Sequence, residues 1–96
     1  METLIFDDVT NFLDTIPESD AAKILAHLKA LQENQTEGLF IKPLKGKIKE
    51  IVIRQYRIIF FEKGTRRYAV DAFKKQSKKT PQRIINRAEK IYKSIS

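Results

Sequence analysis

The sequence predicts an α+β domain in which two N-terminal helices, an antiparallel sheet of three to four strands and a C-terminal helix follow one another along the chain. Three observations support this fold class. Apolar residues recur with helical spacing in the first third, β-branched and aromatic residues dominate the middle, and helical spacing returns after residue 80. Without a linker or an internal repeat, residues 1–96 should form one domain with one modest core.

The first third of the chain predicts a pair of helices. Apolar residues recur with helical spacing between residues 9 and 16, and Pro17 should end this first helix. A second helix should begin between Pro17 and Asp20, where acidic side chains complement the helix dipole. Its apolar face consists of Ala21, Ile24, Leu25, Leu28 and Leu31.

The middle of the chain predicts a β-meander. Residues 47–54, 56–62 and 66–73 are rich in β-branched and aromatic side chains, and short turns separate them. Consecutive strands joined by short turns pair in antiparallel fashion. We expect the helices to pack on one face of this sheet and to leave the other face partly open.

A polar, basic loop at residues 74–80 leads into the last predicted helix. Thr80 should be the N-cap of this helix, because Pro81 is tolerated in a first helical turn. The apolar side of the helix carries Ile84, Ile85, Ala88, Ile91, Tyr92 and Ile95. The opposite side carries Arg83, Arg87, Lys90 and Lys93.

Charge is distributed unevenly along the chain, whose net charge is +7. Residues 1–41 carry two lysines and eight acidic residues, a net charge of −6. Residues 42–96 carry seventeen basic and four acidic residues, a net charge of +13. A field this polarised favours a polyanionic partner, most simply nucleic acid.

Several kinds of active site are disfavoured by what the sequence lacks. It has no cysteine, and the acidic residues of the C-terminal half fall on separate predicted elements, so we expect neither a metal site nor a cofactor. The single histidine, His27, lies beside the apolar stripe of the second helix and should be partly exposed. With no leader peptide and no apolar run as long as a membrane span, the protein is expected to be cytoplasmic.

The chemistry that is still open to this sequence depends on the cationic side chains of arginine and lysine. RNA carries its own nucleophile, the 2′-hydroxyl, and arginine or lysine can align it with the phosphorus and stabilise the added negative charge. Strand alternation places Arg57 within cross-strand reach of Arg54 and Glu50 if the turn between the strands is tight. Glu50 is then either a general base or an ion-pair partner of arginine. The candidate catalytic residues are Arg57, Lys74, Arg54 and Glu50.

A second group of residues is placed to bind RNA. Phe73 is either a core residue or a stacking platform for a base. Either Lys74 or Lys75 should face the same surface as Arg57, and lysines near residue 45 would form the opposite wall. The candidate RNA-binding residues are Phe73, Lys75, Lys78, Lys79, Arg83, Lys42, Lys45 and Lys47.

Three segments, PLKGKIKEIVIR, QYRIIFFEKG and AFKKQSKKTPQRIINRAEKIY, resemble the phage-derived HigB-like branch of the RelE toxin superfamily. The similarity covers residues 17–96 and rests on Tyr56-Arg57 together with Phe73-Lys74-Lys75 and Thr80-Pro81. It implies a RelE-like fold and ribosome-dependent, metal-independent cleavage of mRNA that leaves a 2′,3′-cyclic phosphate and a 5′-hydroxyl. It also implies a partner antitoxin with a helix-turn-helix DNA-binding domain, similar to HigA.

The resemblance also assigns roles to residues. Arg57 would contact the scissile phosphate, and Lys74 or Lys75 would act as general acid or charge stabiliser. Relatives often place lysine or histidine where this chain has Glu50 and Val52, so the general base is unassigned. The strand that usually precedes the first helix is expected to be short or missing, because only residues 4–6 are available for it.

Two alternatives to a toxin stay open. A relative that has lost its chemistry would be a non-catalytic module that binds RNA or a protein partner, and its sequence would look much the same. A DNA-associated phage protein is the other alternative, although no recognition-helix motif is visible.

Overall fold

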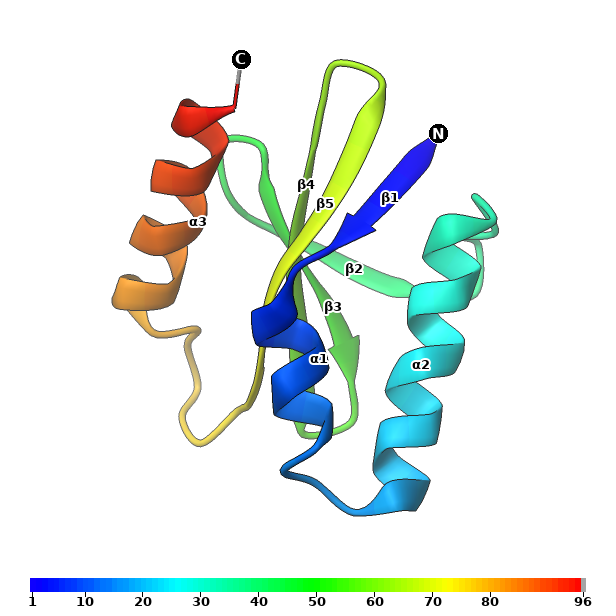
Figure 1. Cartoon of the computed structure of the whole chain (residues 1–96). Helices are drawn as coiled ribbons and strands as arrows, with labels where there is room; N and C mark the ends of the chain where they lie inside the picture. The colour runs from blue at the N-terminus through cyan, green and yellow to red at the C-terminus, as the bar shows by residue number, and fades with distance from the viewer. Residues whose placement is uncertain (96) are drawn as a thin grey trace.

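The computed structural model describes residues 1–95 and confirms the α+β architecture (Figure 1). The elements along the chain are β1 (Glu2–Ile5), α1 (Asp7–Leu13), α2 (Glu18–Gln32), β2 (Phe40–Lys45), β3 (Ile48–Ile53), β4 (Tyr56–Lys63), β5 (Arg66–Lys74) and α3 (Gln82–Ser94). The three helices and the three central strands lie where the hydrophobic patterns predict them, with small differences at their ends.

The sheet has five strands in the order β1-β5-β4-β3-β2, rather than three to four. The first strand is short, as expected, but it is not missing: β1 has four residues and pairs in parallel with β5 along Glu2–Ile5, so it begins two residues before the segment 4–6 that the sequence suggested. Its pairing uses backbone groups and therefore needs few apolar side chains. The sequence pattern also missed β2, which contains Pro43 and occupies the other edge of the sheet, where proline is tolerated.

Two-residue turns join β2 to β3, β3 to β4 and β4 to β5. The first residue of each turn has a positive φ: 54° at Gly46, 55° at Arg54 and 63° at Gly64. Glycine adopts this conformation without steric penalty, whereas at Arg54 it costs roughly 1–2 kcal/mol. The Arg54 turn is nevertheless tight, and it sets the register in which Ile53 pairs with Tyr56.

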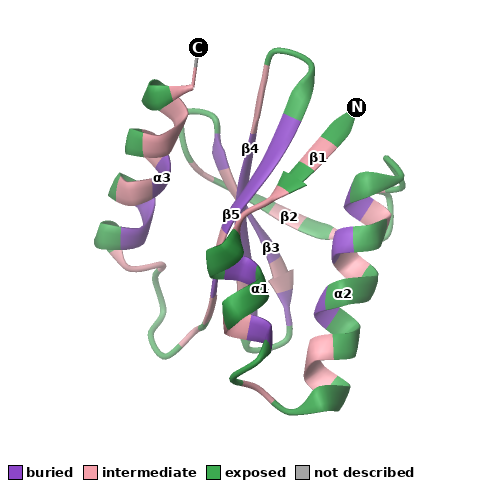
Figure 2. Ribbon diagram, in the orientation of Figure 1, coloured by how far each residue is buried: buried purple, intermediate pink, exposed green. Residues whose placement is uncertain are grey.

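The helices cover both faces of the sheet, so the expectation that they share one face is wrong (Figure 1). Ile58 and Phe60 of β4 face α1 and α2, while Ile59 and Phe61 face α3. A strand that is apolar on both sides requires cover on both sides. The buried residues of all three helices accordingly point toward the sheet (Figure 2).

Arg67 on β5 attaches the C-terminal end of α2 to the sheet. Its side chain is only 9% exposed. Nη1 donates to the carbonyl oxygen of Leu31 at 2.6 Å and to Asn34 Oδ1 at 3.1 Å, and Nη2 donates to Glu62 Oε2 at 2.7 Å. A cation at this position adds a donor to a carbonyl in the last turn of the helix and complements the negative end of the helix dipole.

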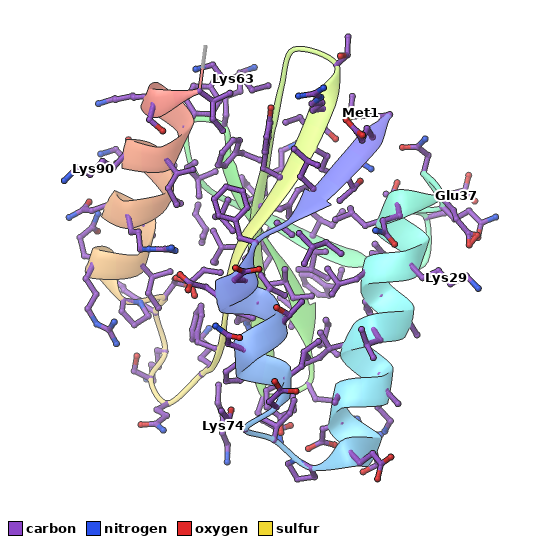
Figure 3. The ribbon with its side chains drawn as sticks, in the orientation of Figure 1. Met1, Lys29, Glu37, Lys63, Lys74 and Lys90 are labelled. Atoms are coloured by element: carbon purple, nitrogen blue, oxygen red, sulfur yellow. The ribbon has the colours of Figure 1, made fainter. Side chains whose placement is uncertain are left out.

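Lys63 on β4 attaches the C-terminal end of α3 to the opposite face of the sheet. Its Nζ donates to the carbonyl oxygens of Tyr92 and Ile95, both at 2.6 Å, and lies 4.4 Å from the centre of the Tyr92 ring. Figure 3 shows Lys63 beside the C-terminal end of α3. The β4–β5 hairpin therefore holds one helix on each side of the sheet.

The second helix buries a narrower stripe than its sequence predicts. Ile24, Leu28 and Leu31 are buried, but Leu25 is 53% exposed. Ile24, Leu28 and Leu31 follow one row along the helix, and Leu25 lies to one side of this row. A hydrogen bond of 2.6 Å from the Tyr56 hydroxyl to Asp20 Oδ2 holds the N-terminal end of the same helix.

Replacing Arg67 by methionine should lower the free energy of unfolding by about 1–3 kcal/mol, because the donor to the buried α2 carbonyl and the partly buried contact with Glu62 are both lost. Arg66→Met is the matched control. Arg66 pairs with Glu2 at 2.8 Å on the exposed surface, so its loss should change the free energy of unfolding by less than about 1 kcal/mol. Urea unfolding measures the free energy of unfolding of both variants. Equal losses in the two variants would show that Arg67 does not attach α2 to the sheet.

Candidate nucleic-acid interface

Part of the sheet face that carries α3 is left uncovered by that helix. There, four side chains from neighbouring strands stand in one cross-strand line, which we call the Arg57 row: Phe40, Val52, Arg57 and Phe73. Helix α3 packs further along the same face, over Ile59, Phe61 and Tyr68. The Arg57 row is therefore partly or fully exposed, while its neighbours under α3 are buried.

Glu50 is a buried carboxylate beside the Arg57 row, and its side chain is 2% exposed. Its Oε1 accepts a hydrogen bond of 2.6 Å from the Thr80 hydroxyl, and its Oε2 lies 3.8 Å from Arg57 Nε. The predicted proximity of Glu50 and Arg57 is thus observed. Because both carboxylate oxygens face a protein group, Glu50 holds other residues in place.

Arg57 is held rigidly at the end of β4. Its side chain is 11% exposed, and Nη1 donates to the carbonyl oxygens of Arg54 at 2.7 Å and Tyr56 at 2.8 Å. Within residues 1–95, Nη2 donates to no protein acceptor, and Nε has only the distant Glu50 carboxylate. The guanidinium is therefore oriented by the protein and keeps its Nη2 donors for an anion such as a phosphate, whereas Nε is buried.

Arg54 contributes its backbone carbonyl to this arrangement. Its side chain lies exposed in the β3–β4 turn, outside the contacts around Glu50. The sequence placed Arg54 near Arg57 correctly, but the interaction runs through the main chain.

Next to Glu50 the surface is hollowed into a cleft of about 290 Å³. Four lysines line it, and we call it the lysine cleft: Lys42, Lys75, Lys78 and Lys79. Lys42 lies directly opposite Glu50 across β2 and β3, while the other three lysines come from the loop between β5 and α3. With one carboxylate already engaged by Thr80, the lysine cleft is a strongly cationic surface.

Lys75, rather than Lys74, belongs to this surface. Lys74 pairs with Tyr56, so its side chain begins on the α1 and α2 side of the sheet, and Figure 3 shows it at the opposite end of the molecule from Lys63. The cause is a bulge in β5, where Val70 is left unpaired between Ala69 and Asp71. One extra residue reverses the alternation of the strand beyond it.

Lys45, Lys47 and Arg83 do not join the lysine cleft. Lys45 forms a 3.1 Å salt bridge with Glu89 of α3, and Lys47 lies beside it, next to a separate hollow. Arg83 is exposed in the first turn of α3. Phe73 is partly buried and packs against the core under α3, although it is the cross-strand neighbour of Arg57.

Thr80 is not the N-cap of α3, contrary to expectation. Pro81 occupies that position, and no side chain caps the helix. The Thr80 hydroxyl instead donates to Glu50, which is thirty residues away in sequence. Nothing in the local sequence distinguishes this long-range contact from an ordinary helix cap, so sequence reasoning missed Thr80 as a part of the site.

Asp71 lies at a junction of three elements, apart from the lysine cleft. Burial raises the pKa of its carboxyl, and Arg87 Nη1 at 3.4 Å partly opposes that shift. Arg87 also pairs with Asp8, so this cluster links α1, β5 and α3. Because the folded protein favours protonated Asp71, the stability that this group contributes is lost as the pH rises through its raised pKa.

Outside the lysine cleft, three features of the described residues bear on function: the single histidine, the grouping of possible metal ligands, and the length and hydrophobicity of the helices. His27 is partly exposed on α2, where its Nδ1 lies 2.8 Å from the carbonyl oxygen of Lys23. Among residues 1–95, no three acidic, cysteine or histidine side chains gather closely enough to hold a metal ion. No helix in that part of the chain has the length and hydrophobicity needed to cross a membrane.

Replacing Thr80 by valine should lower the free energy of unfolding by about 1–3 kcal/mol, because Glu50 Oε1 stays buried without its donor. Thr80→Ser should restore most of this loss. The matched control is Thr10→Val, which removes an exposed hydroxyl that bonds the Asp7 carbonyl and should change stability by less than about 0.5 kcal/mol. Chemical denaturation tests the prediction, and a Thr80→Val protein as stable as the wild type would refute it.

Comparison with known proteins adds a family and a fold. The family described as phage derived protein Gp49-like matches residues 11–93. A chain of the archaeal RelE–RelB complex from Pyrococcus horikoshii OT3 is similar in structure, with a TM-score of 0.65 and 16% identity over 81% of this chain and 97% of that chain. A chain of the RelB–RelE antitoxin–toxin complex from Methanococcus jannaschii also has a TM-score of 0.65 and 16% identity, and the match covers 97% of this chain and 99% of that chain. No match was found among curated protein sequences.

Proposed function

This chain belongs to the family of phage-derived Gp49-like proteins, and we propose that it is a RelE-type toxin that cleaves messenger RNA on the ribosome without a metal ion. The observation that carries the proposal is the arrangement around Arg57. A guanidinium fixed by two backbone carbonyls keeps donors for a phosphate, and it lies beside a cleft lined by four lysines. The RelE-like fold supports the same assignment.

In this reaction the RNA supplies the nucleophile. The 2′-hydroxyl loses its proton to solvent water and its oxygen attacks the adjacent phosphorus. The bond from phosphorus to the 5′-oxygen breaks, the 5′-oxygen takes up a proton, and the products are a 2′,3′-cyclic phosphate and a 5′-hydroxyl. Arg57 stabilises the charge that develops on the phosphate oxygens. Lys75 neutralises charge at the leaving oxygen and can supply its proton, which is the role that the sequence assigned to Lys74 or Lys75.

Glu50 acts as a brace in this proposal, because Thr80 and Arg57 engage its two oxygens. Lys42, Lys78 and Lys79 then bind the backbone phosphates of messenger and ribosomal RNA. The site of action is the ribosome in the cytoplasm. RelE is complexed with RelB in the two similar structures, and we propose a helix-turn-helix antitoxin as the corresponding partner here.

Arg57→Ala should reduce cleavage of mRNA on programmed ribosomes by roughly a hundredfold or more, because one preorganised donor to the transition state is lost. Growth arrest on induction in bacterial cells should weaken in parallel. Arg66→Ala removes an exposed arginine on the same hairpin and should leave both unchanged. Cleavage and growth arrest that match the wild type in the Arg57→Ala variant would remove Arg57 from the mechanism.

A single 2′-deoxynucleotide at the cleaved position should protect the mRNA completely, because the nucleophile is then missing. End analysis of the fragments should find the cyclic phosphate and the 5′-hydroxyl. Cleavage of the deoxy-substituted message, or a 5′-phosphate product, would show a different chemistry.

One observation favours a second function, a non-catalytic RNA-binding module. In the described chain, the ionisable residues around the lysine cleft are lysines and one engaged carboxylate, and the only histidine of the sequence lies on α2. No side chain there has an ordinary pKa near neutrality, as an efficient general base needs. Full-length mRNA recovered from ribosomes that carry the wild-type protein would favour this function.

A further inference from the structure

Phe40 is the most exposed large apolar residue of the described chain, at 62%. It lies on the edge strand β2 and pairs with Val52, which pairs with Arg57 on the next strand. All three side chains therefore project from the same face of the sheet. The neighbouring Ile41 points the other way and packs against the α1 and α2 core, which confirms the alternation.

The surroundings of Phe40 are cationic. Lys42 follows two residues later on the same face of β2 and lines the lysine cleft, and Arg57 lies two strands away. Strand spacing places Phe40 and Arg57 roughly 10 Å apart. A base next to a phosphate held by Arg57 can therefore reach the Phe40 ring.

Exposed aromatic rings beside cations are a common means of binding single-stranded RNA, because any base can stack on them while the cations hold the backbone. Leu25, the next most exposed large apolar residue, lies on the opposite face of the molecule, away from these cations. Val52 is a partly exposed apolar neighbour of Phe40, but Lys42 and Arg57 lie next to this pair on the same face, so the surroundings suit a polyanion with bases better than a hydrophobic protein partner.

We propose that Phe40 is the stacking platform for a nucleobase next to the scissile phosphate. This inference rests on the proposed RNA-directed function and adds a binding residue on the edge strand. The Phe40 ring stacks on an unpaired base, Arg57 holds the neighbouring phosphate, and the lysine cleft receives the continuing strand. Stacking requires no particular base, so Phe40 contributes affinity and alignment rather than sequence preference.

The chain contains no tryptophan, so Phe40→Trp introduces a single tryptophan at the proposed contact, whose emission can be excited separately from that of the three tyrosines. A single-stranded 2′-O-methyl oligoadenosine, which cannot be cleaved, should quench its emission. An abasic oligonucleotide of the same length should bind through its phosphates without quenching. Leu25→Trp provides the matched control, and its emission should not respond to either oligonucleotide.

Affinity provides the second measurement. Anisotropy of the labelled oligoadenosine should show binding roughly fivefold to a hundredfold weaker for Phe40→Ala than for the wild type, the range expected for loss of one stacked base. Phe40→Tyr should retain the affinity, and Leu25→Ala should not alter it. In the ribosomal cleavage assay, Phe40→Ala should raise the protein concentration needed for half-maximal rate and Phe40→Tyr should not.

Three outcomes would overturn the proposal. The first is oligoadenosine binding that leaves the introduced tryptophan unquenched, and the second is the absence of binding at low salt. The third is emission that responds to a protein partner alone, which would assign Phe40 to a protein interface. Quenching by oligoadenosine together with uncleaved ribosomal mRNA would support the stacking role while refuting the nuclease function, so the two failures are distinguishable.

Discussion

The arrangement of the candidate site depends on one buried charge, the carboxylate of Glu50. A carboxylate removed from water is strongly unfavourable unless donors or cations surround it. Here Thr80 donates to one oxygen and Arg57 lies beside the other. The Thr80 contact attaches the basic loop to the sheet, and the Glu50 carboxylate adds a favourable charge beside a guanidinium that two backbone carbonyls already hold. Lys75 is fixed near Arg57 by its backbone hydrogen bond to Gln55, whereas the loop around Lys78 and Lys79 is attached to the sheet through Thr80 and Glu50.

The location of the site follows from how the helices cover the sheet. The β4–β5 hairpin places Arg67 under the end of α2 and Lys63 under the end of α3, one on each face. Helix α3 is thereby held toward the β4–β5 turn, where it covers Phe61 and Tyr68. The opposite end of that face stays open, and the strand ends there display Arg57. A helix attached at one end of a sheet thus defines a surface at the other end.

Local patterns in the sequence were sufficient for the helices, the central strands and the pairing of Arg57 with Glu50, because periodicity and strand alternation are short-range properties. They were insufficient wherever a distant partner decides the outcome. Strand β1 forms because β5 offers a free edge, and Thr80 binds Glu50 because the fold brings them together. The unpaired Val70 reverses the alternation of β5, so Lys75 faces the lysine cleft and Lys74 faces the other side of the sheet. A bulge of this kind leaves no clear mark in the sequence.

The two kinds of cation at the site differ in how they act. Arg57 is immobilised by the protein before any RNA is bound, so its dipoles need little reorganisation when charge develops on a phosphate. Lys42, Lys78 and Lys79 are exposed side chains that raise the local concentration of a polyanion through their summed field. Six of the eight acidic residues of the first 41 positions lie on α1 and α2 or at the C-caps of these helices, across the sheet from the lysine cleft. RNA is therefore repelled from one side and attracted to the other, which orients the molecule before contact is made.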